Sequence, residues 1–271
     1  MTDLIIGAGL VGLTTALELL KRGQQVVVVD SGQSEGQGTS FANGGLLTPS
    51  MSDPWNTPGV HRHLADYLFA SNSALKVRWR AIPSLLGWGP RFLWNSRPGR
   101  YRAATLANYE LGIYSLAVLD ELRRELALSF DASDKGTLKF FRSSHALDAA
   151  MGVTGQLRSY GLEANELSRD DTVLIEPCLA PIADQLVGAI HYPKDKAGDA
   201  HLFCRGLAKR IRELGGTFHF GCDVRAIEVR GGRIVGADLG DRMLAADNIV
   251  ISSGAASPHL GRTLGARLPI K

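Results

Sequence analysis

"LIIGAGLVG" (residues 4–12) is the most informative stretch of this 271-residue sequence, because an apolar run leads directly into three closely spaced glycines. The residues after it place apolar side chains at helical spacing: Leu13, Ala16, Leu17 and Leu20. Gly23 ends this helix, and a second apolar run, residues 26–29, leads to Asp30. Strand, turn, helix and strand in this order predict a parallel sheet that is covered on both faces.

The spacing of the glycines predicts a dinucleotide site. In a Rossmann turn, Gly7 would make the turn, Gly9 would let a pyrophosphate approach the backbone, and Gly12 would let helix and strand pack closely. Asp30 would accept hydrogen bonds from the adenosine ribose hydroxyls. A glycine-rich turn in an unrelated α/β protein is the alternative. This unit alone does not separate NAD from FAD, because both present the same adenosine diphosphate half.

A loop of small residues, "TSFANGG" (residues 39–45), follows the second strand. A flavin carries a broad ring system beyond the pyrophosphate, so the backbone near it must approach closely, which small residues permit. The loop therefore favours FAD over NAD. Its candidate cofactor contacts are Ser40, Asn43, Gly44 and Gly45.

The composition, with 45% hydrophobic and 21% charged residues, is that of a globular chain with room for two domains. A formal charge of +3 is too small to indicate a nucleic-acid-binding protein. Cys178, Cys204 and Cys222 form no C-x-x-C pair, so neither disulfides nor a metal site is predicted, and a reducing, cytoplasmic compartment is expected. We find no signal peptide and no apolar run of the roughly 18 residues that a membrane span needs.

Further along, apolar residues recur at spacings of three and four from Leu106 to Leu126 and predict one long helix with a core-facing side. We expect Ser168 and Asp199 to be N-caps of later helices. The other expected elements are a strand over 136–142, a helix over 147–160, a strand over 186–192, a β-meander over 217–220, 224–229 and 234–239, and a parallel strand over 249–251.

Segments spread in order along the chain resemble bacterial D-amino-acid dehydrogenases, which are FAD enzymes of the glycine oxidase and D-amino-acid oxidase superfamily. The segments are "TSFANGGLLTPSMSDPWNTPGV" (39–60), 136–138 with 141–142, 188–193, 198–199, 202–203 and 249–255. The resemblance implies an α/β fold: a Rossmann-like FAD-binding domain with a parallel sheet and a β-meander, plus an inserted α+β substrate domain. It implies that the FAD-binding domain comprises 1–60 and 196–261, that the insertion comprises 61–195, and that 262–271 begins a C-terminal segment.

The resemblance also implies the chemistry. A D-amino acid would deliver hydride to flavin N5, yielding a 2-oxo acid and ammonia, and the electrons would pass to a quinone-type acceptor. A glycine, sarcosine or hydroxyproline type of amine oxidase is the alternative. In this superfamily the position of Val224 resembles one whose backbone contacts the adenine end, although an ordinary buried valine explains the residue equally well. The turn at Gly254 resembles one that returns to the cofactor.

The catalytic residues stay unassigned, as does the arginine that would bind the substrate carboxylate. We expect the histidines to be surface or loop residues rather than bases: His61, His63, His191 and His201. The sequence ends near the point where related chains begin the strands that complete the substrate domain. We therefore expect the N-terminal two thirds of such an enzyme, either active with its remainder elsewhere or a fragment that binds FAD without catalysis.

Residues 76–102 contain six arginines, one lysine and no acidic residue, together with Trp79, Trp88 and Trp94. One interpretation is peripheral contact with the inner face of a bacterial membrane through anionic lipid. The other is a solvated basic face whose tryptophans pack inward.

Overall fold

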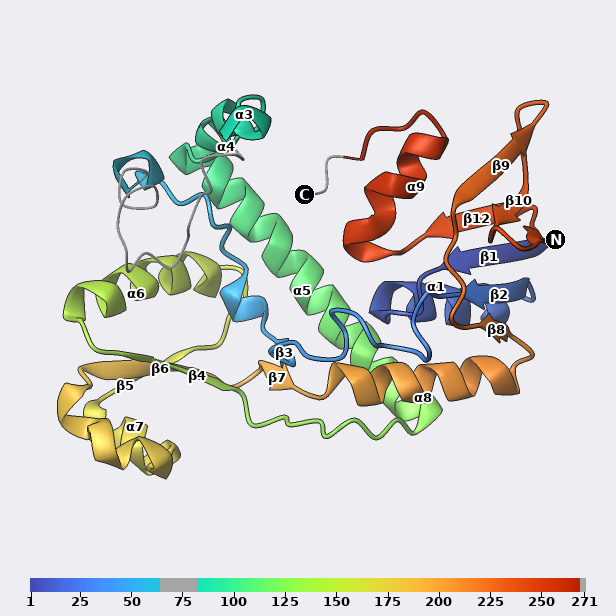
Figure 1. The fold of residues 1–271 in the computed structure, drawn as a ribbon. Helices are drawn as coiled ribbons and strands as arrows, with labels where there is room; N and C mark the ends of the chain where they lie inside the picture. Colours follow the sequence, from blue (N-terminus) through green and yellow to red (C-terminus); the bar gives the residue numbers. More distant parts are fainter. Residues whose placement is uncertain (64–81, 269–271) are drawn as a thin grey trace. The chain divides into compact units, whose positions relative to one another are not determined.

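The structure is a computed structural model that describes residues 1–63 and 82–268, and Figure 1 shows its elements in chain order. The chain divides into two compact units. Unit 1 comprises Met1–Leu46, Asp120–Ser133 and Ala197–Lys271, and unit 2 comprises Leu47–Leu119 and Asp134–Lys196. The functional division into an FAD-binding and a substrate domain, with the boundaries given above, stays a prediction.

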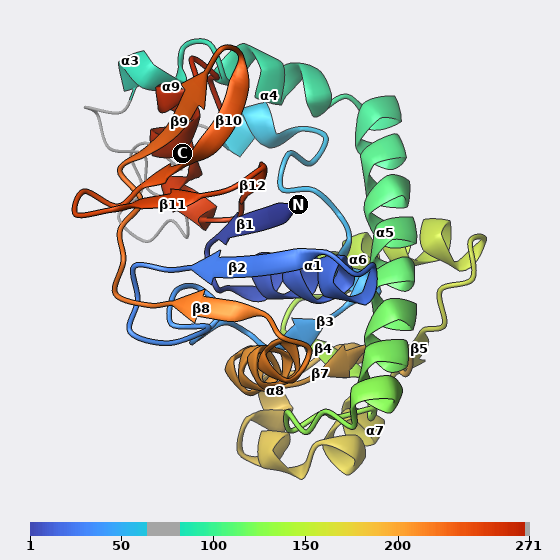
Figure 2. The ribbon, with the colours of Figure 1, turned by 90° about the vertical axis from the view of Figure 1, so that its right-hand side faces the viewer.

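Unit 1 is built on a four-stranded sheet in the order β12-β1-β2-β8, and Figure 2 shows β2 between β1 and β8. Its strands are β1 (Thr2–Ile6), β2 (Gln25–Val29), β8 (Thr217–His219) and β12 (Asn248–Ile251). All three pairings are parallel. Leu4, Ile5 and Val28 are at most 1% exposed, as expected for strands covered on both faces.

Two helices pack on each other in this unit, α1 (Leu10–Lys21) and α8 (Ala200–Glu213), and α1 also packs on β1 and β2. Asp199 is the N-cap of α8, as predicted, and its carboxylate accepts a hydrogen bond from the Leu202 N–H at 2.8 Å. Leu207 and Ile211 on the apolar face of α8 are fully buried. The predicted strand, turn, helix and strand at the N-terminus are confirmed.

An antiparallel meander completes unit 1: β9 (Ala226–Arg230), β10 (Arg233–Asp238) and β11 (Met243–Ala245), followed by η5 (Gly254–Ala256) and α9 (Ser257–Thr263). Val224 and Ile227 share one buried core with Leu4 and Ile6 of β1. The prediction that residues 217–220 begin this meander is wrong. β8 instead pairs in parallel with β2, because α8 is the crossover helix that returns the chain to the edge of the sheet.

Unit 2 contains a three-stranded antiparallel sheet in the order β4-β6-β5. Its elements are η1 (Pro49–Met51), η2 (Val60–His63), α3 (Ile82–Leu85), α4 (Gly89–Asn95), β4 (Thr137–Phe141), α6 (Ser144–Arg158), β5 (Asn165–Leu167), α7 (Arg169–Ile175), η4 (Pro177–Gln185) and β6 (Gly188–Tyr192). Ser168 is the N-cap of α7, as predicted, and its hydroxyl accepts a hydrogen bond from the Asp171 N–H at 3.1 Å.

The long helix α5 spans Pro98–Leu126, so it begins earlier than the predicted start at Leu106. Proline is well accommodated in the first turn of a helix. The polar residues that follow it have no apolar repeat, so the sequence pattern does not reveal this start of the helix. Tyr109, Leu116 and Leu122 are buried as predicted, whereas Ile113 is 43% exposed and is not core.

A two-stranded sheet pairs β3 (Leu46–Leu47) with β7 (Lys196–Ala197).

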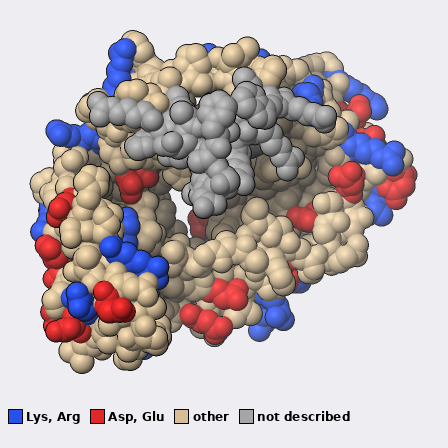
Figure 3. Space-filling model, turned by 60° about the vertical axis from the view of Figure 1, so that its left-hand side comes forward, with Lys and Arg blue, Asp and Glu red and all other residues tan. Residues whose placement is uncertain are grey.

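On the face drawn in Figure 3, basic and acidic side chains are interspersed over the described surface rather than gathered into a field of one sign. Nucleic-acid recognition needs basic residues gathered on one side, so the described part of this face does not have that character. Among residues 1–63 and 82–268, no helix is long and apolar enough to cross a membrane.

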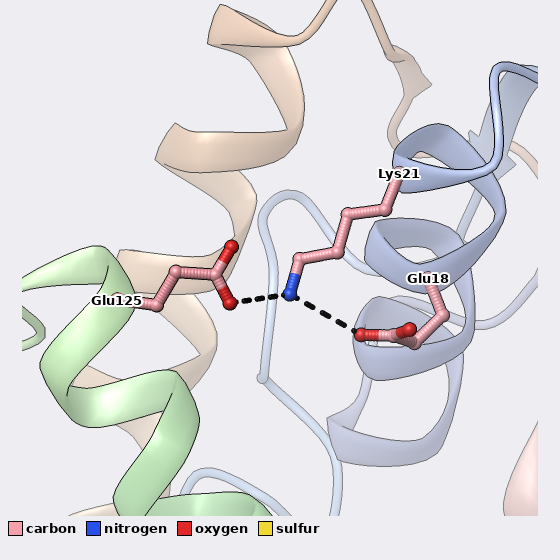
Figure 4. A network of polar contacts seen from close by, with 3 residues as sticks. All are labelled: Glu18, Lys21 and Glu125. Carbon is pink, nitrogen blue, oxygen red and sulfur yellow. Dashed lines mark hydrogen bonds and ion pairs between the residues drawn. The ribbon is translucent and has the colours of Figure 1, made fainter.

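Figure 4 shows a small ionic network in unit 1, in which the Lys21 ammonium lies 2.6 Å from Glu125 Oε2 and 3.5 Å from Glu18 Oε1. The hydrogen bond with Glu125 is the main cause that raises the pKa of Lys21, and burial opposes it. A raised lysine pKa stabilises the fold below the unfolded pKa of about 10.4, and this contribution is lost as the pH rises through the folded pKa.

We expect a double-mutant cycle of Lys21→Met and Glu125→Gln to give a coupling of about 0.5 kcal/mol at pH 7. Urea unfolding would measure it, and the coupling should decline as the pH rises through the raised pKa of Lys21, because the ammonium then loses its proton. Lys194 and Glu163, 3.7 Å apart and both more than half exposed, are the matched control pair and should show almost none. Equal coupling in the two pairs would contradict our assignment of a stabilising interaction to Lys21 and Glu125.

Candidate functional site

The turn between β1 and α1 depends on two of its three glycines for steric reasons. Gly7 has a φ of +114°, and a Cβ on it would lie 2.5 Å from the Ser252 carbonyl oxygen. A Cβ on Gly12 would overlap with the Gly7 carbonyl oxygen. The turn, the first turn of α1 and the end of β12 therefore pack backbone to backbone.

The N-terminus of α1 is open and carries no negative side chain. Its N-cap is Gly9, which offers no side-chain cap, and its first turn contains no acidic residue. The N–H of Leu10 donates a hydrogen bond to the Ser40 hydroxyl at 3.3 Å, and Ser40 is only 7% exposed. The fold thus brings Ser40, from the loop after β2, to the helix end where an anion is most stable.

Cys204, on α8, is fully buried and interacts with Ser40. Burial raises the pKa of its thiol to about 11, and the hydrogen bond with Ser40 opposes this shift. The thiol is therefore neutral at physiological pH, and it adds no charge that would repel a phosphate.

Asp30 holds the glycine turn directly. Its carboxylate accepts hydrogen bonds from the Ala8 N–H at 2.6 Å and from the Gly32 N–H at 2.7 Å, one on each oxygen. Each carboxylate oxygen has a second lone pair, so both remain able to accept from another donor. Sequence reasoning did not anticipate this bond to the turn.

The loop residues Asn43 and Gly45 have backbone roles of their own. The side-chain oxygen of Asn43 accepts a hydrogen bond from the Gly45 N–H at 2.8 Å. Gly45 has a φ of +59°, its carbonyl accepts from the Gly198 N–H at 2.8 Å, and a Cβ on it would overlap with the Gly198 carbonyl oxygen. Gly44 is exposed and under no such restriction.

His201 lies in the first turn of α8 and is half-buried, so it is not in a loop but remains partly at the surface. Its Nδ1 is 3.3 Å from the Gly36 carbonyl oxygen, and its ring packs edge-on against Phe41, with ring centroids 5.0 Å apart. His201 therefore holds the loop after β2. His191 likewise lies in β6, with Nε2 3.1 Å from the Lys135 carbonyl oxygen.

Val224 and Gly254, the two candidate residues from the later part of the sequence, lie near the glycine turn between β1 and α1. Val224 is 6% exposed, and the Cys222 N–H donates to the Asp30 carbonyl at 3.0 Å, so its segment runs beside the end of β2. Gly254 is exposed with a φ of +54°, two residues after Ser252. Ser252 itself was missed by sequence reasoning: its hydroxyl donates to the Ile6 carbonyl at 2.9 Å.

These residues fit the adenosine diphosphate half of FAD. Gly9 and the Ser40 hydroxyl at the N-terminal end of α1 suit the pyrophosphate, and Asp30 at the end of β2 suits the ribose. In contrast, a shallow depression of about 670 Å³ is lined by residues in the last turns of α5 and directly after it: Asp120, Arg123, Arg124, Ala127 and Leu128. It includes no residue of the glycine turn and offers no helix N-terminus, so it does not match a dinucleotide.

Comparisons with known proteins bear on the family and the cofactor. A family model described as "FAD dependent oxidoreductase" (DAO) matches residues 4–271. The D-amino acid dehydrogenases of Sinorhizobium medicae (strain WSM419) and Dechloromonas aromatica (strain RCB) are 35% and 36% identical to the whole chain, over 270 and 275 residues. The chain spans 65% and 66% of their lengths.

The crystal structure of glycine oxidase from Geobacillus kaustophilus matches with a TM-score of 0.67 and 23% identity, covering 97% of this chain and 58% of that one. This likeness shows the fold. It confirms the expected α/β architecture with a parallel sheet and additional antiparallel sheets.

Proposed function

Because the chain belongs to the family of FAD-dependent oxidoreductases, we propose that its glycine turn binds FAD and that the enzyme oxidises D-amino acids to 2-oxo acids and ammonia. The observation that carries this proposal is the meeting of three groups at one end of the parallel sheet. They are the open N-terminus of α1, the Ser40 hydroxyl on its first N–H, and the Asp30 carboxylate on the Ala8 N–H.

Each residue has a defined part in this proposal. Gly9 and the N-terminal end of α1 hold the pyrophosphate. The Ser40 hydroxyl, which accepts from the Leu10 N–H, donates its own hydrogen to it, and Asp30 accepts from the ribose. Val224 and Gly254 contribute backbone on either side of Asp30 and the turn. In the loop, Asn43 and Gly45 shape the backbone, and Gly44 is the residue with room for close approach.

Bound FAD would supply an acceptor for the hydride that leaves the carbon bearing the amine. The likeness to D-amino acid dehydrogenases supports D-amino acids as the substrates. We propose a quinone-type molecule as the electron acceptor. A substrate that binds as its free amine needs orientation more than it needs a strong base, which agrees with the structural roles of His191 and His201.

An anaerobic visible spectrum of the 271-residue chain tests the proposal directly. We expect reconstitution with FAD to give a bound-flavin spectrum, and D-alanine to bleach it, while L-alanine leaves it unchanged. Bleaching by glycine or sarcosine instead would favour the other amine oxidase type. A chain that retains no FAD after gel filtration would refute the cofactor assignment, whereas retained FAD that no amine reduces would refute the substrate assignment.

We also propose that α3, α4 and the start of α5 contact an anionic membrane surface. Leu86 is 69% exposed, Trp88 52% and Trp94 49%, so these tryptophans are not packed inward. The guanidinium of Arg97 lies 3.6 Å from the centroid of the Trp94 ring. Exposed indole rings next to arginines suit the interface between acyl chains and anionic headgroups. The rest of this segment, including Trp79, lies outside the described residues.

Flotation with liposomes tests this contact. We expect the protein to float with vesicles that contain anionic lipid at low salt, and to float less at about 0.5 M salt, because surface charges are then screened. Trp88→Ala with Trp94→Ala should reduce flotation several-fold. Tyr114→Ala, which removes an exposed aromatic side chain elsewhere on α5, is the control. The proposal would be refuted if flotation were the same with neutral and anionic vesicles and were unchanged by the two tryptophan substitutions.

A further inference from the structure

Asp195 is a buried carboxylate that neither the glycine turn nor the FAD loop uses. It is 2% exposed and lies between β6 and β7. Its Oδ2 accepts hydrogen bonds from the Ser50 hydroxyl at 2.5 Å and the Thr137 hydroxyl at 2.6 Å, and its Oδ1 accepts from the Ser50 N–H at 3.4 Å. Hydrogen bonds to a buried charge are among the strongest in proteins, so this group holds η1 firmly.

The position of Asp195 in the chain connects it to the proposed FAD loop, residues 39–45. The loop ends at Gly45, whose carbonyl accepts from the Gly198 N–H at 2.8 Å. β3 and β7 then pair as a two-stranded sheet. Asp195 directly precedes β7, and Ser50 follows β3, so the hydrogen bonds between these two residues lie beyond one end of the small sheet. The hydrogen bond between Gly45 and Gly198 lies at the other end.

The segment after the loop is also held by α5. The Asn108 side-chain amide donates to the Ser52 carbonyl at 2.9 Å. A Cβ on Gly112 would lie 3.2 Å from Pro49 Cα, so the helix backbone approaches η1 closely. Within the described residues, the Ser52 hydroxyl is buried without a hydrogen-bond partner. Such groups are rare, and they mark places where a water or a ligand atom completes the bonding.

From these contacts we propose that Asp195 is a positioning residue, which fixes residues 46–53 through Ser50 and so sets the path by which the chain leaves the FAD loop. It touches neither FAD nor substrate in this proposal, and it acts through the backbone that it holds. The inference rests on the proposed function, because the loop matters only if it binds FAD.

Two variants that remove a hydroxyl from the same carboxylate oxygen separate positioning from general stability. Ser50→Ala frees the segment after the loop, whereas Thr137→Val changes β4 and leaves Ser50 in place. We expect similar losses of melting temperature from both. Ser50→Ala should weaken FAD binding about tenfold, equivalent to ~1.4 kcal/mol, and Thr137→Val less than threefold. Ser50→Thr, which retains a hydroxyl, should restore the affinity.

Amide hydrogen exchange without FAD provides a second readout. The Met51 N–H, bonded to the Thr48 carbonyl at 3.0 Å, and the Ser50 N–H should exchange at least about tenfold faster in Ser50→Ala and remain protected in Thr137→Val. Ser50→Cys, with a weaker donor, replaces Ser50→Ala if that variant does not fold. Equal effects of the two substitutions on FAD affinity, or unchanged exchange at residues 50 and 51, would overturn the proposal. Failure of the unsubstituted chain to bind FAD would instead overturn the proposed function, and the exchange rates would still test Asp195.

Discussion

Replacement of Gly12 with alanine is expected to abolish tight FAD binding and to lower the free energy of unfolding by about 3 kcal/mol. A Cβ at this position would overlap with the Gly7 carbonyl oxygen and lie 2.7 Å from the Ser252 hydroxyl oxygen. Neither neighbour can move aside easily, because Gly7 is part of the tight turn and the Ser252 N–H donates to the Ile6 carbonyl at 2.8 Å. Helix α1 must shift instead, and its first N–H groups shift with it.

Thermal unfolding without FAD and a titration of flavin fluorescence measure the two effects separately. For a chain of this size, 3 kcal/mol corresponds to a fall in melting temperature of roughly 6–12 °C. We expect the dissociation constant for FAD to rise at least about 100-fold, equivalent to ~2.8 kcal/mol. A Gly12→Ala protein that binds FAD as tightly as the unsubstituted chain would show that the pyrophosphate lies elsewhere.

Gly155→Ala is the matched control, because Gly155 lies in α6 and a Cβ on it would meet nothing within 4 Å. Alanine is favoured over glycine inside a helix by about 0.5–1 kcal/mol. The control should therefore raise the melting temperature slightly and leave FAD binding unchanged.

The elements that could be predicted from the sequence are those whose signal is local. The turn at Gly7, Gly9 and Gly12 follows from an apolar run, glycine spacing and a helical repeat within a short stretch. The N-caps Ser168 and Asp199 follow from a side chain that reaches only three residues along the chain. Each signal is complete within one helical turn or one strand, so tertiary context did not change it.

The error at β8 arose where pairing between distant segments decides the structure. The sequence of β8 is compatible with either sheet, and only the path of α8 places it beside β2. In the candidate site, the bond between Ser40 and Leu10 and the packing of Ser252 on the glycine turn join residues far apart in the chain. Ser40 was reached through the small residues of its loop, and Ser252 had no local signal that could have revealed it.

Asp30→Ala is expected to produce the second large effect, and it tests the double role that the structure suggests for this carboxylate. Loss of the carboxylate leaves the Ala8 and Gly32 N–H groups without their present acceptor. Unsatisfied donors of this kind cost about 1–3 kcal/mol each, so we expect the free energy of unfolding to fall by roughly 2–4 kcal/mol. The proposed bonds to the ribose disappear as well, so FAD binding should weaken by at least about 100-fold.

Asp3→Ala separates these two roles. Asp3 is 5% exposed, lies near the start of β1, and accepts a hydrogen bond from the Asn248 side-chain amide at 2.8 Å. It is therefore a buried aspartate of the same sheet, whereas Asp30 is half-buried, and it lies at the ends of the strands opposite to those where dinucleotides bind. Urea unfolding should show a comparable loss of stability in both variants, whereas a flavin fluorescence titration should show weaker FAD binding only in Asp30→Ala. If both variants keep the affinity of the unsubstituted chain, Asp30 holds the turn and does not contact the ribose.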